Sequence, residues 1–300
     1  MATTQATTQA TIQQQSGKTR RTRQVITQYQ KERSLEQLRE HYEIEKELAN
    51  RLRNASREER RGLYNEVYDE RLRRIPHHPL ATKAADPVAQ QAAVTPQLKL
   101  LQPLLKAEHV FMEVGPGDCA LAMAVAPYVR HVHGVDVSDG LVQEGARPEN
   151  FELHIADGFE IPVPVGSVHV AYSNQMMEHL HREDALEQLA NIHRAMAPGG
   201  CYVCITPNRL SGPWDISRHF DDVATGLHMH EYTVAEMVET FRQVGFRRVR
   251  AFVSYEGHHL TPQLPVAPFC WLEWGLAHLP RTLRRNLSHS LTAVKIVAIK

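Results

Sequence analysis

The sequence has little cysteine, and its few thiols do not form a metal or redox motif. Four cysteines in 300 residues are too few for a disulfide framework. Cys201 and Cys204 form a C-x-x-C pair, but the surrounding stretch CYVCIT alternates as a β-strand does, which sends the two thiols to opposite faces. A disulfide-stapled fold is therefore excluded, and we expect no zinc or redox role for this pair.

The chain also lacks net charge and long apolar runs. Its 34 basic and 34 acidic residues cancel, so no overall field favours nucleic acid, a membrane surface or an acidic substrate. No apolar run approaches the roughly 20 residues that cross a bilayer, and the first residues lack the apolar core of a secretory signal. We therefore expect a cytoplasmic protein with no membrane span and no nucleic acid partner.

The first 84 residues differ in composition from the rest of the chain. Residues 1–30 are rich in Thr and Gln and poor in large apolar side chains, which predicts a disordered tail. Residues 31–84 are predicted to form a helical extension of two helices, because apolar residues recur at helical spacing and Asn54-Ala55-Ser56 interrupts them. Their narrow apolar stripes must cover the rest of the chain or form the contact of a homodimer.

Residues 85–300 alternate between strand and helix patterns, which is typical of parallel βα units. The predicted strands cover residues 109–114, 131–136, 151–156, 168–173 and 200–206, and the predicted helices cover 118–128, 139–146 and 183–197. A further helix and strand follow, and the chain ends in TAVKIVAIK, a strand without its own helix, which we expect to insert antiparallel. The predicted fold class is α/β: a Rossmann-like, seven-stranded, mostly parallel sheet with an antiparallel last strand, helices on both faces and an N-terminal helical extension.

A glycine-rich turn follows the first of these strands in the stretch VFMEVGPGDCALAM. In an open parallel sheet such a turn brings backbone N–H groups close to a ligand, and a side chain at Gly115 or Gly117 would fill that space. Asp136 ends the second strand, where its carboxylate can accept hydrogen bonds from both hydroxyls of a ribose. The turn also satisfies the G-x-G-x-x-(G/A) fingerprint of nicotinamide-binding folds, so a dinucleotide and another adenosine compound both remain open.

Two further acidic residues distinguish between these ligands. Asp157 and Gly158 end the third strand, where a short carboxylate can accept a hydrogen bond from the exocyclic amine of adenine. Glu113 places a negative charge beside the glycine turn, which repels a pyrophosphate and stabilises a ligand that carries an ammonium and a sulfonium. The turn is therefore predicted to bind a cation-bearing adenosine.

Four stretches carry a resemblance to a known family: MEVGPGDCALA, GVDVS, IADGFEIPVPVGSVHVAYSNQMMEHL and HRAMAPGGCYVCITPN. In that order they resemble the successive motifs of class I S-adenosylmethionine-dependent methyltransferases, over residues 85–300. The resemblance implies S-adenosylmethionine as the cofactor, with contacts to its methionine part, ribose and adenine. It implies that Gly115 and Gly117 contact the methionine part, Asp136 the ribose, Asp157 the adenine, and Asn174 the cofactor from the fourth strand. The full set of predicted cofactor residues is Glu113, Gly115, Pro116, Gly117, Asp136, Val137, Asp157, Gly158 and Asn174. His169 departs from the family, which usually has an acidic residue at that position.

Methyl transfer of the kind that this resemblance implies needs alignment of donor and acceptor, exclusion of water, and removal of one proton when the acceptor is a hydroxyl. A histidine suits the last task because its ordinary pKa lies near neutrality. Histidines cluster after the fourth and fifth strands, on the side of the sheet where the methyl group should point. The candidate catalytic residues are His179, His219 and His228.

The stretch QMMEHL, followed later by HMHEYT, also resembles the E-x-x-E-H metal-binding pattern of ubiquinone-biosynthesis and small-RNA 2'-O-methyltransferases. Glu178, His179 and His228 match that pattern, whereas Gln175 stands in place of the first glutamate. An amide oxygen can bind a hard cation, though without the charge. The resemblance implies a divalent metal at these three residues, and local hydrogen bonding is the alternative.

Two insertions are expected on the substrate side, at residues 208–232 and 257–289. The first is too long for a bare connector and is predicted to form a lid or a substrate wall. The second holds four large apolar residues, which either line an acceptor pocket or pack against the sheet: Phe269, Trp271, Trp274 and Leu276.

The function implied is methyl transfer from S-adenosylmethionine to an oxygen of a small molecule or glycan-like metabolite, with a histidine as the base. Three alternatives stay open. The first is an RNA 2'-O-methyltransferase that uses a divalent metal and the basic stretch KTRRTR. The second is a NAD(P)-dependent oxidoreductase, and the third is a non-catalytic binding module that uses its N-terminal helices for assembly.

Overall fold

The computed structural model describes residues 33–143, 145–255, 257–259, 261, 263–288 and 293–300. The predicted tail at residues 1–30, with its stretch KTRRTR, lies outside these residues. None of the described helices combines the length and the hydropathy that crossing a bilayer requires.

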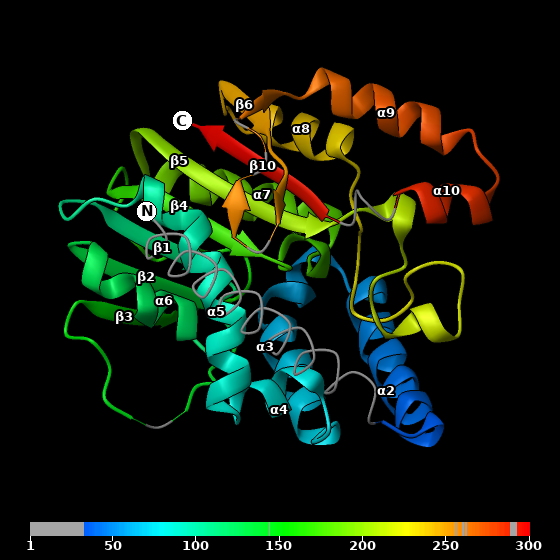
Figure 1. The fold of residues 1–300 in the computed structure, drawn as a ribbon. Helices are drawn as coiled ribbons and strands as arrows, with labels where there is room; N and C mark the ends of the chain where they lie inside the picture. The colour runs from blue at the N-terminus through cyan, green and yellow to red at the C-terminus, as the bar shows by residue number, and fades with distance from the viewer. Residues whose placement is uncertain (1–32, 144, 256, 260, 262, 289–292) are drawn as a thin grey trace, which may run out of the picture.

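One sheet of eight strands forms the centre of the molecule (Figure 1). Its five parallel strands are β1 (Val110–Val114), β2 (His131–Asp136), β3 (Phe151–Ile155), β4 (Val168–Asn174) and β5 (Met196–Pro207). The strand order is β3-β2-β1-β4-β5-β10-β6-β9. β10 (Ala293–Ile299) runs antiparallel between β5 and β6 (Arg248–Ala251), which confirms the predicted antiparallel insertion.

The sheet has one strand more than predicted. The additional strand is β9 (Leu264–Pro265), a two-residue edge strand that pairs with β6. Two other short strands, β7 (Ser254–Tyr255) and β8 (His258–His259), pair with each other as a separate ribbon. The Rossmann-like arrangement is unaffected, because both additions follow β6.

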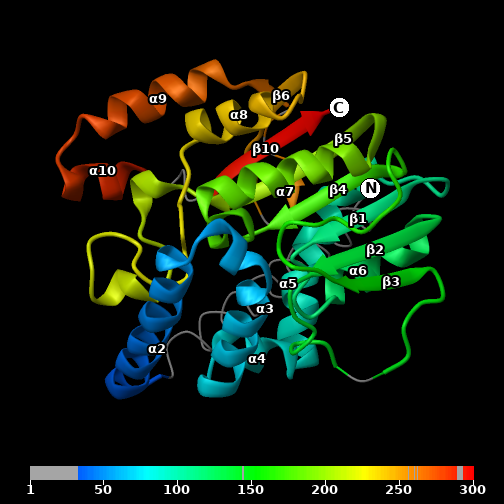
Figure 2. The ribbon, with the colours of Figure 1, turned by 180° about the vertical axis from the view of Figure 1, so that it is seen from behind.

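Helices cover both faces of the sheet, as predicted (Figures 1 and 2). On one face lie α5 (Pro87–Leu101), continued by a 3₁₀ turn (Gln102–Leu104), and α6 (Ala120–Val125); on the other lie α7 (Arg182–Ala195) and α8 (Val234–Gln243). Neighbouring strand residues point to opposite sides, so Phe111 joins the core under α5 and α6 while Met112 joins the core under α7 and α8.

Two predicted helices after β1 and β2 differ from the structure. The helix expected at 118–128 begins only at Ala120, because Cys119 has a left-handed backbone with φ of 58°, and it passes into a 3₁₀ turn (Ala126–Tyr128) that contains Pro127. No helix forms among the described residues of 139–146. Gly140 and Gly145 lower the helix propensity of that segment.

The N-terminal helices pack against the sheet of the same chain. They are α2 (Leu35–Asn54), α3 (Arg57–Arg74), which is broken at Arg61 and Gly62, and α4 (Pro79–Ala84). Ser34 and Ser56 begin α2 and α3 with capping boxes. Leu52 and Tyr64 are fully buried in the core that α7 and α8 share. Their apolar stripes therefore cover the sheet, which was the first of the two predicted arrangements.

The two insertions form short helical elements. Residues 208–232 contain 3₁₀ turns at Arg209–Ser211 and Ile216–His219, and residues 257–289 contain α9 (Ala267–Ala277) and α10 (Arg281–Leu287). Trp271 and Trp274 are 76% and 70% exposed, so these two side chains do not pack against the sheet. Leu276 is buried and Phe269 packs against the core, as the packing alternative requires.

A buried ion pair fastens α3 to the start of α7. Nε and Nη2 of Arg60 donate to the carboxylate of Asp184 at 2.5 and 2.9 Å, and the Tyr64 hydroxyl donates to the same carboxylate at 2.8 Å. The side chains of Arg60 and Asp184 are only 4% and 0% exposed. Removal of Asp184 would leave the buried Arg60 with one charged partner among the described residues, the 66% exposed Glu183 at 3.2 Å, so most of the compensation for its burial would be lost.

Asp184→Ala is therefore expected to lower the free energy of unfolding by about 3–5 kcal/mol. Glu187→Ala serves as the control, because Glu187 pairs with Arg57 and Arg61 near the surface, and its loss is expected to cost less than about 1 kcal/mol. Urea unfolding followed by circular dichroism measures both variants. Similar losses would contradict a special contribution of the buried pair.

Candidate functional site

The glycine turn after β1 keeps its backbone open to a ligand. Gly115 has φ of 71°, and its N–H donates to the carbonyl oxygen of Val135 at 2.9 Å. A Cβ at Gly115 would lie 2.7 Å from Cγ of Met176, so a side chain has no room there. Gly117 is also left-handed, with φ of 58°. Both positions therefore favour glycine.

Asp136 ties this turn to the end of β2. Its Oδ2 accepts a hydrogen bond from the N–H of Gly117 at 2.8 Å, and its Oδ1 accepts one from the N–H of Val137 at 2.7 Å. Burial raises the pKa of Asp136, and these two hydrogen bonds oppose that rise. Each carboxylate oxygen keeps a further lone pair, so Asp136 can still accept hydrogen bonds from a ligand.

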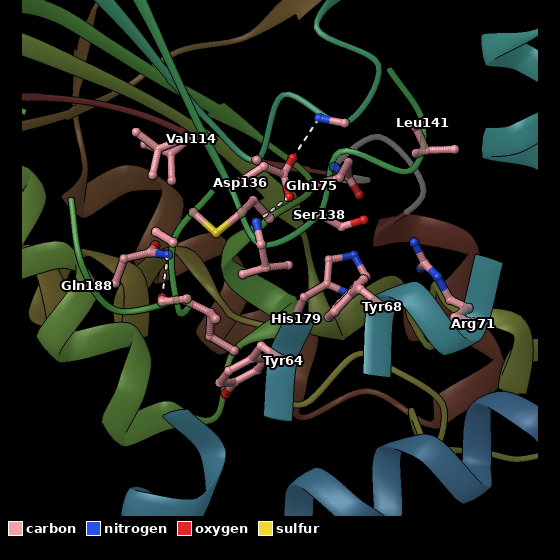
Figure 3. Close-up of a pocket in the computed structure, with 18 of the residues that line it drawn as sticks. Tyr64, Tyr68, Arg71, Val114, Asp136, Ser138, Leu141, Gln175, His179 and Gln188 are labelled. Atoms are coloured by element: carbon pink, nitrogen blue, oxygen red, sulfur yellow. Dashed lines mark hydrogen bonds between the residues drawn. The ribbon is translucent and has the colours of Figure 1, made fainter. Parts of the chain in front are cut away.

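A first cavity opens beside the turn (Figure 3). The ends of β1 and β2 and the loop after β3 supply Gly115, Asp136 and Gly158 to its lining. The opposite wall comes from α3, which supplies Tyr64 and Tyr68. The N-terminal helices therefore complete a cavity whose floor is the sheet.

The wall from α3 was not predicted from the sequence. Four residues of this helix line the first cavity: Tyr64, Tyr68, Arg71 and Leu72. Their spacing places them on one helix face, but an ordinary core face has the same spacing. Asn65 fixes the helix over the site, because its Nδ2 donates to the carbonyl oxygens of Val137 and Ala156 at 2.7 and 3.0 Å.

The nine predicted cofactor residues do not all face this cavity. Five line it: Gly115, Gly117, Asp136, Val137 and Gly158. Three line an adjoining second cavity, together with Gly115 and Gly117: Glu113, Pro116 and Asn174. Asp157 lines neither, because its Oδ1 accepts from the N–H groups of Phe159 and Glu160 at 2.9 Å and its Oδ2 pairs with Arg61 at 2.9 Å. Its carboxylate braces the loop after β3 against α3.

Glu113 is buried beside the turn, and its Oε2 accepts no hydrogen bond from the described residues. Burial, and then the charge of nearby Asp118, raises the pKa of Glu113 to about 8. At pH 7 the carboxyl group of the free protein is therefore mostly protonated. The fixed negative charge that we expected here from the sequence needs either a higher pH or a bound cation.

The second cavity is the larger of the two and lies on the side of α2. α2 and the start of α4 supply His41 and His78, and the 208–232 insertion supplies Trp214 and His219. The insertion thus forms part of the wall of this cavity. Seven residues line both cavities: Arg71, Leu80, Gly115, Gly117, Leu141, Gln175 and His179. The two cavities therefore adjoin each other at these residues, near the end of β4.

His179 lines both cavities and His228 lines the second, whereas Glu178 is fully buried beside them and lines neither. Their potential ligand atoms are all within 4.8 Å of one another. Nδ1 of His179, in the 3₁₀ turn Met177–His179, donates to the carbonyl oxygen of Leu227 at 3.1 Å, which leaves a lone pair on Nε2. Oε2 of Glu178 accepts from the Thr206 hydroxyl at 2.8 Å, while its buried Oε1 has no hydrogen-bond partner among the described residues.

The three candidate histidines differ in their surroundings. Burial, and then the charge of His228, lowers the pKa of His179 to about 3. Burial acts in the same direction on His228, but its hydrogen bond with Glu231, with Nδ1 2.8 Å from Oε1, and the charge of Glu178 raise its pKa above the ordinary value. His219 is exposed on the wall of the second cavity. Of the three, His228 is therefore the strongest proton acceptor.

Comparison with known proteins agrees with this geometry. Residues 111–200 match a family model described as a methyltransferase domain. A probable S-adenosylmethionine-dependent methyltransferase of Mycolicibacterium smegmatis is 29% identical over 136 residues, which are 45% of this chain and 51% of that protein. The chain thus spans about half the length of this curated relative.

A solved structure shares the fold. The methyltransferase of Haloferax volcanii in complex with the Trm112 methyltransferase activator superposes with a TM-score of 0.52 and 19% identity, over 73% of this chain and 96% of that one. The nicotinamide oxidoreductase that the glycine turn left open finds no support in these matches. The family match runs from β1 to the start of β5, through the glycine turn and Asp136, so this part of the chain is similar to methyltransferase domains.

Proposed function

We propose that this chain transfers the methyl group of S-adenosylmethionine to an oxygen atom of a small molecule or glycan-like metabolite. The observation that carries the proposal is the junction of the two cavities at Gln175 and His179. The first cavity offers the glycine turn and Asp136 to a nucleoside. The second is lined by several histidines and adjoins the first where a methyl group would have to leave it.

Most residues of the site would contribute by positioning the ligand and by excluding water. Bound S-adenosylmethionine supplies a methyl group on a positively charged sulfur. Gly115 and Gly117 let the backbone approach this ligand, Asp136 accepts hydrogen bonds from its ribose, and Tyr64 and Tyr68 exclude water from the side of α3. Alignment and desolvation would then supply most of the rate.

We assign the role of base to His228. Its Nδ1–H donates to Glu231, which holds the ring and stabilises the imidazolium that forms when Nε2 takes the proton of an acceptor hydroxyl. Trp214 donates its backbone N–H to the same carboxylate oxygen at 2.6 Å, which keeps Glu231 in place. His179 lies next to His228, with ring centres 4.9 Å apart, and can orient the same hydroxyl through its free Nε2.

A divalent cation is the second candidate for the same residues. The unpartnered Oε1 of Glu178 and the two imidazoles of His179 and His228 form a donor set that fits such an ion. When bound, the ion would supply positive charge to an acceptor oxygen. This arrangement favours the RNA 2'-O-methyltransferase alternative, whereas the absence of net charge favours a small-molecule acceptor.

Asp136→Ala is expected to weaken the binding of S-adenosylmethionine by at least about 2 kcal/mol, or roughly 30-fold in Kd, because the ribose hydroxyls lose their acceptor. Asp139→Ala is the matched control, since Asp139 is exposed in the same loop and lines neither cavity. Isothermal titration calorimetry measures both. Unchanged affinity of Asp136→Ala would show that another group holds the ribose.

The affinity for S-adenosylmethionine is expected to rise from pH 7 to pH 9. Below about pH 8 Glu113 is protonated, and a cationic ligand must displace that proton, whereas above this pH the carboxylate is already charged. The ligand's own amine also titrates, so the measurement is the difference between wild type and Glu113→Gln, by calorimetry at each pH. Parallel pH profiles would contradict a contact between Glu113 and the positive charges of the ligand.

Wild-type protein incubated with labelled S-adenosylmethionine and a metabolite extract is expected to yield a methylated small molecule, identified by mass analysis. His228→Gln is expected to lower kcat by about 100-fold or more, since general-base catalysis contributes about that much, while the Kd for S-adenosylmethionine stays unchanged. His278→Gln, at an exposed histidine of the second insertion, is the control.

The same assay separates the alternatives. EDTA is expected to leave the wild-type rate unchanged; a loss that Mg²⁺ or Mn²⁺ restores would reassign Glu178, His179 and His228 to metal binding. Transfer of label to RNA instead of the metabolite fraction would favour the nucleic-acid alternative. Tight binding of S-adenosylmethionine without transfer to either fraction would indicate a binding module.

A further inference from the structure

Four potential metal ligands gather at the β2–β3 edge of the sheet. They are His131 and His133 on β2 and Glu152 and His154 on β3. Alternate residues of a strand share one face, and the parallel register sets His133 opposite Glu152. None of the four lines either of the two cavities. The pairing of the two strands itself therefore holds this cluster together, apart from the methyl-transfer site.

Three of the four residues, His131, His133 and Glu152, have potential ligand atoms that all lie within 4.8 Å of one another, and His154 lies close to two of them. Nε2 of His131, Nδ1 of His133 and Nε2 of His154 lie 3.7, 3.8 and 3.7 Å from Oε2 of Glu152. The nitrogen atoms of His133 and His154 are 3.0 Å apart. With zinc–ligand bonds of about 2.0–2.1 Å, neighbouring ligand atoms of a tetrahedron lie about 3.3–3.4 Å apart. The three contacts with Glu152 are also too long for hydrogen bonds, so these imidazoles surround the carboxylate without satisfying it.

We propose that these four residues bind one zinc ion that links β3 to β2. Imidazole nitrogen and carboxylate oxygen are both zinc ligands. The side chains of Glu152 and His131 are 56% and 33% exposed, so an ion can enter from solvent. Those of His133 and His154 are only 9% and 16% exposed, which anchors the inner half of the site. The charges that act on His133 come from the other three members of the cluster.

The charge around this cluster distinguishes it from the cluster formed by His41, Glu45 and His78 on the wall of the second cavity. There Nη1 of Arg71 lies 3.9 Å from the carboxylate of Glu45, so a guanidinium already neutralises the anion and would repel a metal ion. Among the described residues, the ion pairs of Glu152 involve histidines alone. An imidazole can give up its proton to a metal, which a guanidinium cannot do.

A zinc ion here would stabilise a weak part of the sheet. β3 is an edge strand that pairs only with β2. An ion that binds the folded chain and not the unfolded one adds to the stability by mass action. His133 precedes Asp136 by three residues, or about 10 Å along the strand. The ion would therefore fix the two strands whose carboxyl ends border the cofactor cavity, and this holds whether or not the proposed acceptor is correct.

The test is a zinc titration of the full, untagged chain after removal of metal with EDTA. Calorimetry is expected to show one equivalent of zinc for this site, and the midpoint of thermal unfolding is expected to rise with zinc. Glu152→Gln and His154→Gln should each weaken that equivalent by at least about tenfold, the loss typical of even an outer-shell partner. Circular dichroism tests whether each variant is folded. Because the Glu152 side chain is 56% exposed, Glu152→Gln is expected to fold as wild type does.

Two controls locate the bound ion. Glu149→Gln removes an exposed carboxylate three residues before Glu152 and should leave the titration unchanged. His228→Gln should also keep this equivalent, because it alters the other cluster. The proposal is wrong if wild-type protein binds no zinc, or if the isotherms of Glu152→Gln and His154→Gln match that of wild type. A loss of the equivalent in His228→Gln alone would place the ion at the methyl-transfer site instead.

Discussion

The carboxylate of Asp136 is the contact on which the cofactor side of the molecule depends. It accepts hydrogen bonds from the N–H of Gly117 in the turn after β1 and from the N–H of Val137 at the end of β2, so a single side chain sets the distance between two loops. The turn has little other freedom, since Met176 occupies the space that a side chain at Gly115 would need. The glycine turn is therefore already in position before a ligand binds, and the carboxylate of Asp136 can accept further hydrogen bonds. A ligand that binds there meets a backbone that is already in position, which lowers the entropic cost of binding.

α3 makes the N-terminal helices part of this site. Arg60 and Tyr64 converge on the buried carboxylate of Asp184 at the start of α7, and Asn65 reaches the carbonyl oxygens that follow β2 and β3. These contacts leave the ring of Tyr64 over Gly158, where a Cβ would lie 3.0 Å from it. The same helix therefore belongs to the core on the side of α7 and forms a wall of the first cavity. If α3 lost these contacts, the cavity would be disturbed before the sheet.

The sequence predicted those parts of the site that backbone geometry determines. Gly115 and Asp136 stand at the ends of apolar runs, and the ends of parallel strands meet at one edge of a sheet. The direction of Asp157 could not be predicted, because it depends on Arg61, 96 residues earlier in the chain. Nor could the helix at 139–146 be excluded, since Leu141 has the apolar character of a helix face but lines both cavities. The spacing of His133 and His154 in the sequence does not predict that they lie close together, because only the register of β2 and β3 brings them together.

The acidic residues at the turn distinguish between ligands because the carboxyl group of Glu113 carries a proton in the free protein. Glu113 is close enough to Asp118 and Asp136 for their charges to raise its pKa, so the free protein holds a proton in place of a positive ligand. A sulfonium or an ammonium can replace that proton and restore the carboxylate. A diphosphate would leave that proton bound and would meet Asp136 together with Asp118, whose carboxylate pairs with Lys83 at 3.4 Å. Two unit charges 4 Å apart interact by about 4 kcal/mol at an effective dielectric constant of 20, whereas one hydrogen bond contributes about 1 kcal/mol net. If the proposed function is correct, the charge of the ligand selects the adenosine compound that binds here, in addition to the glycine pattern.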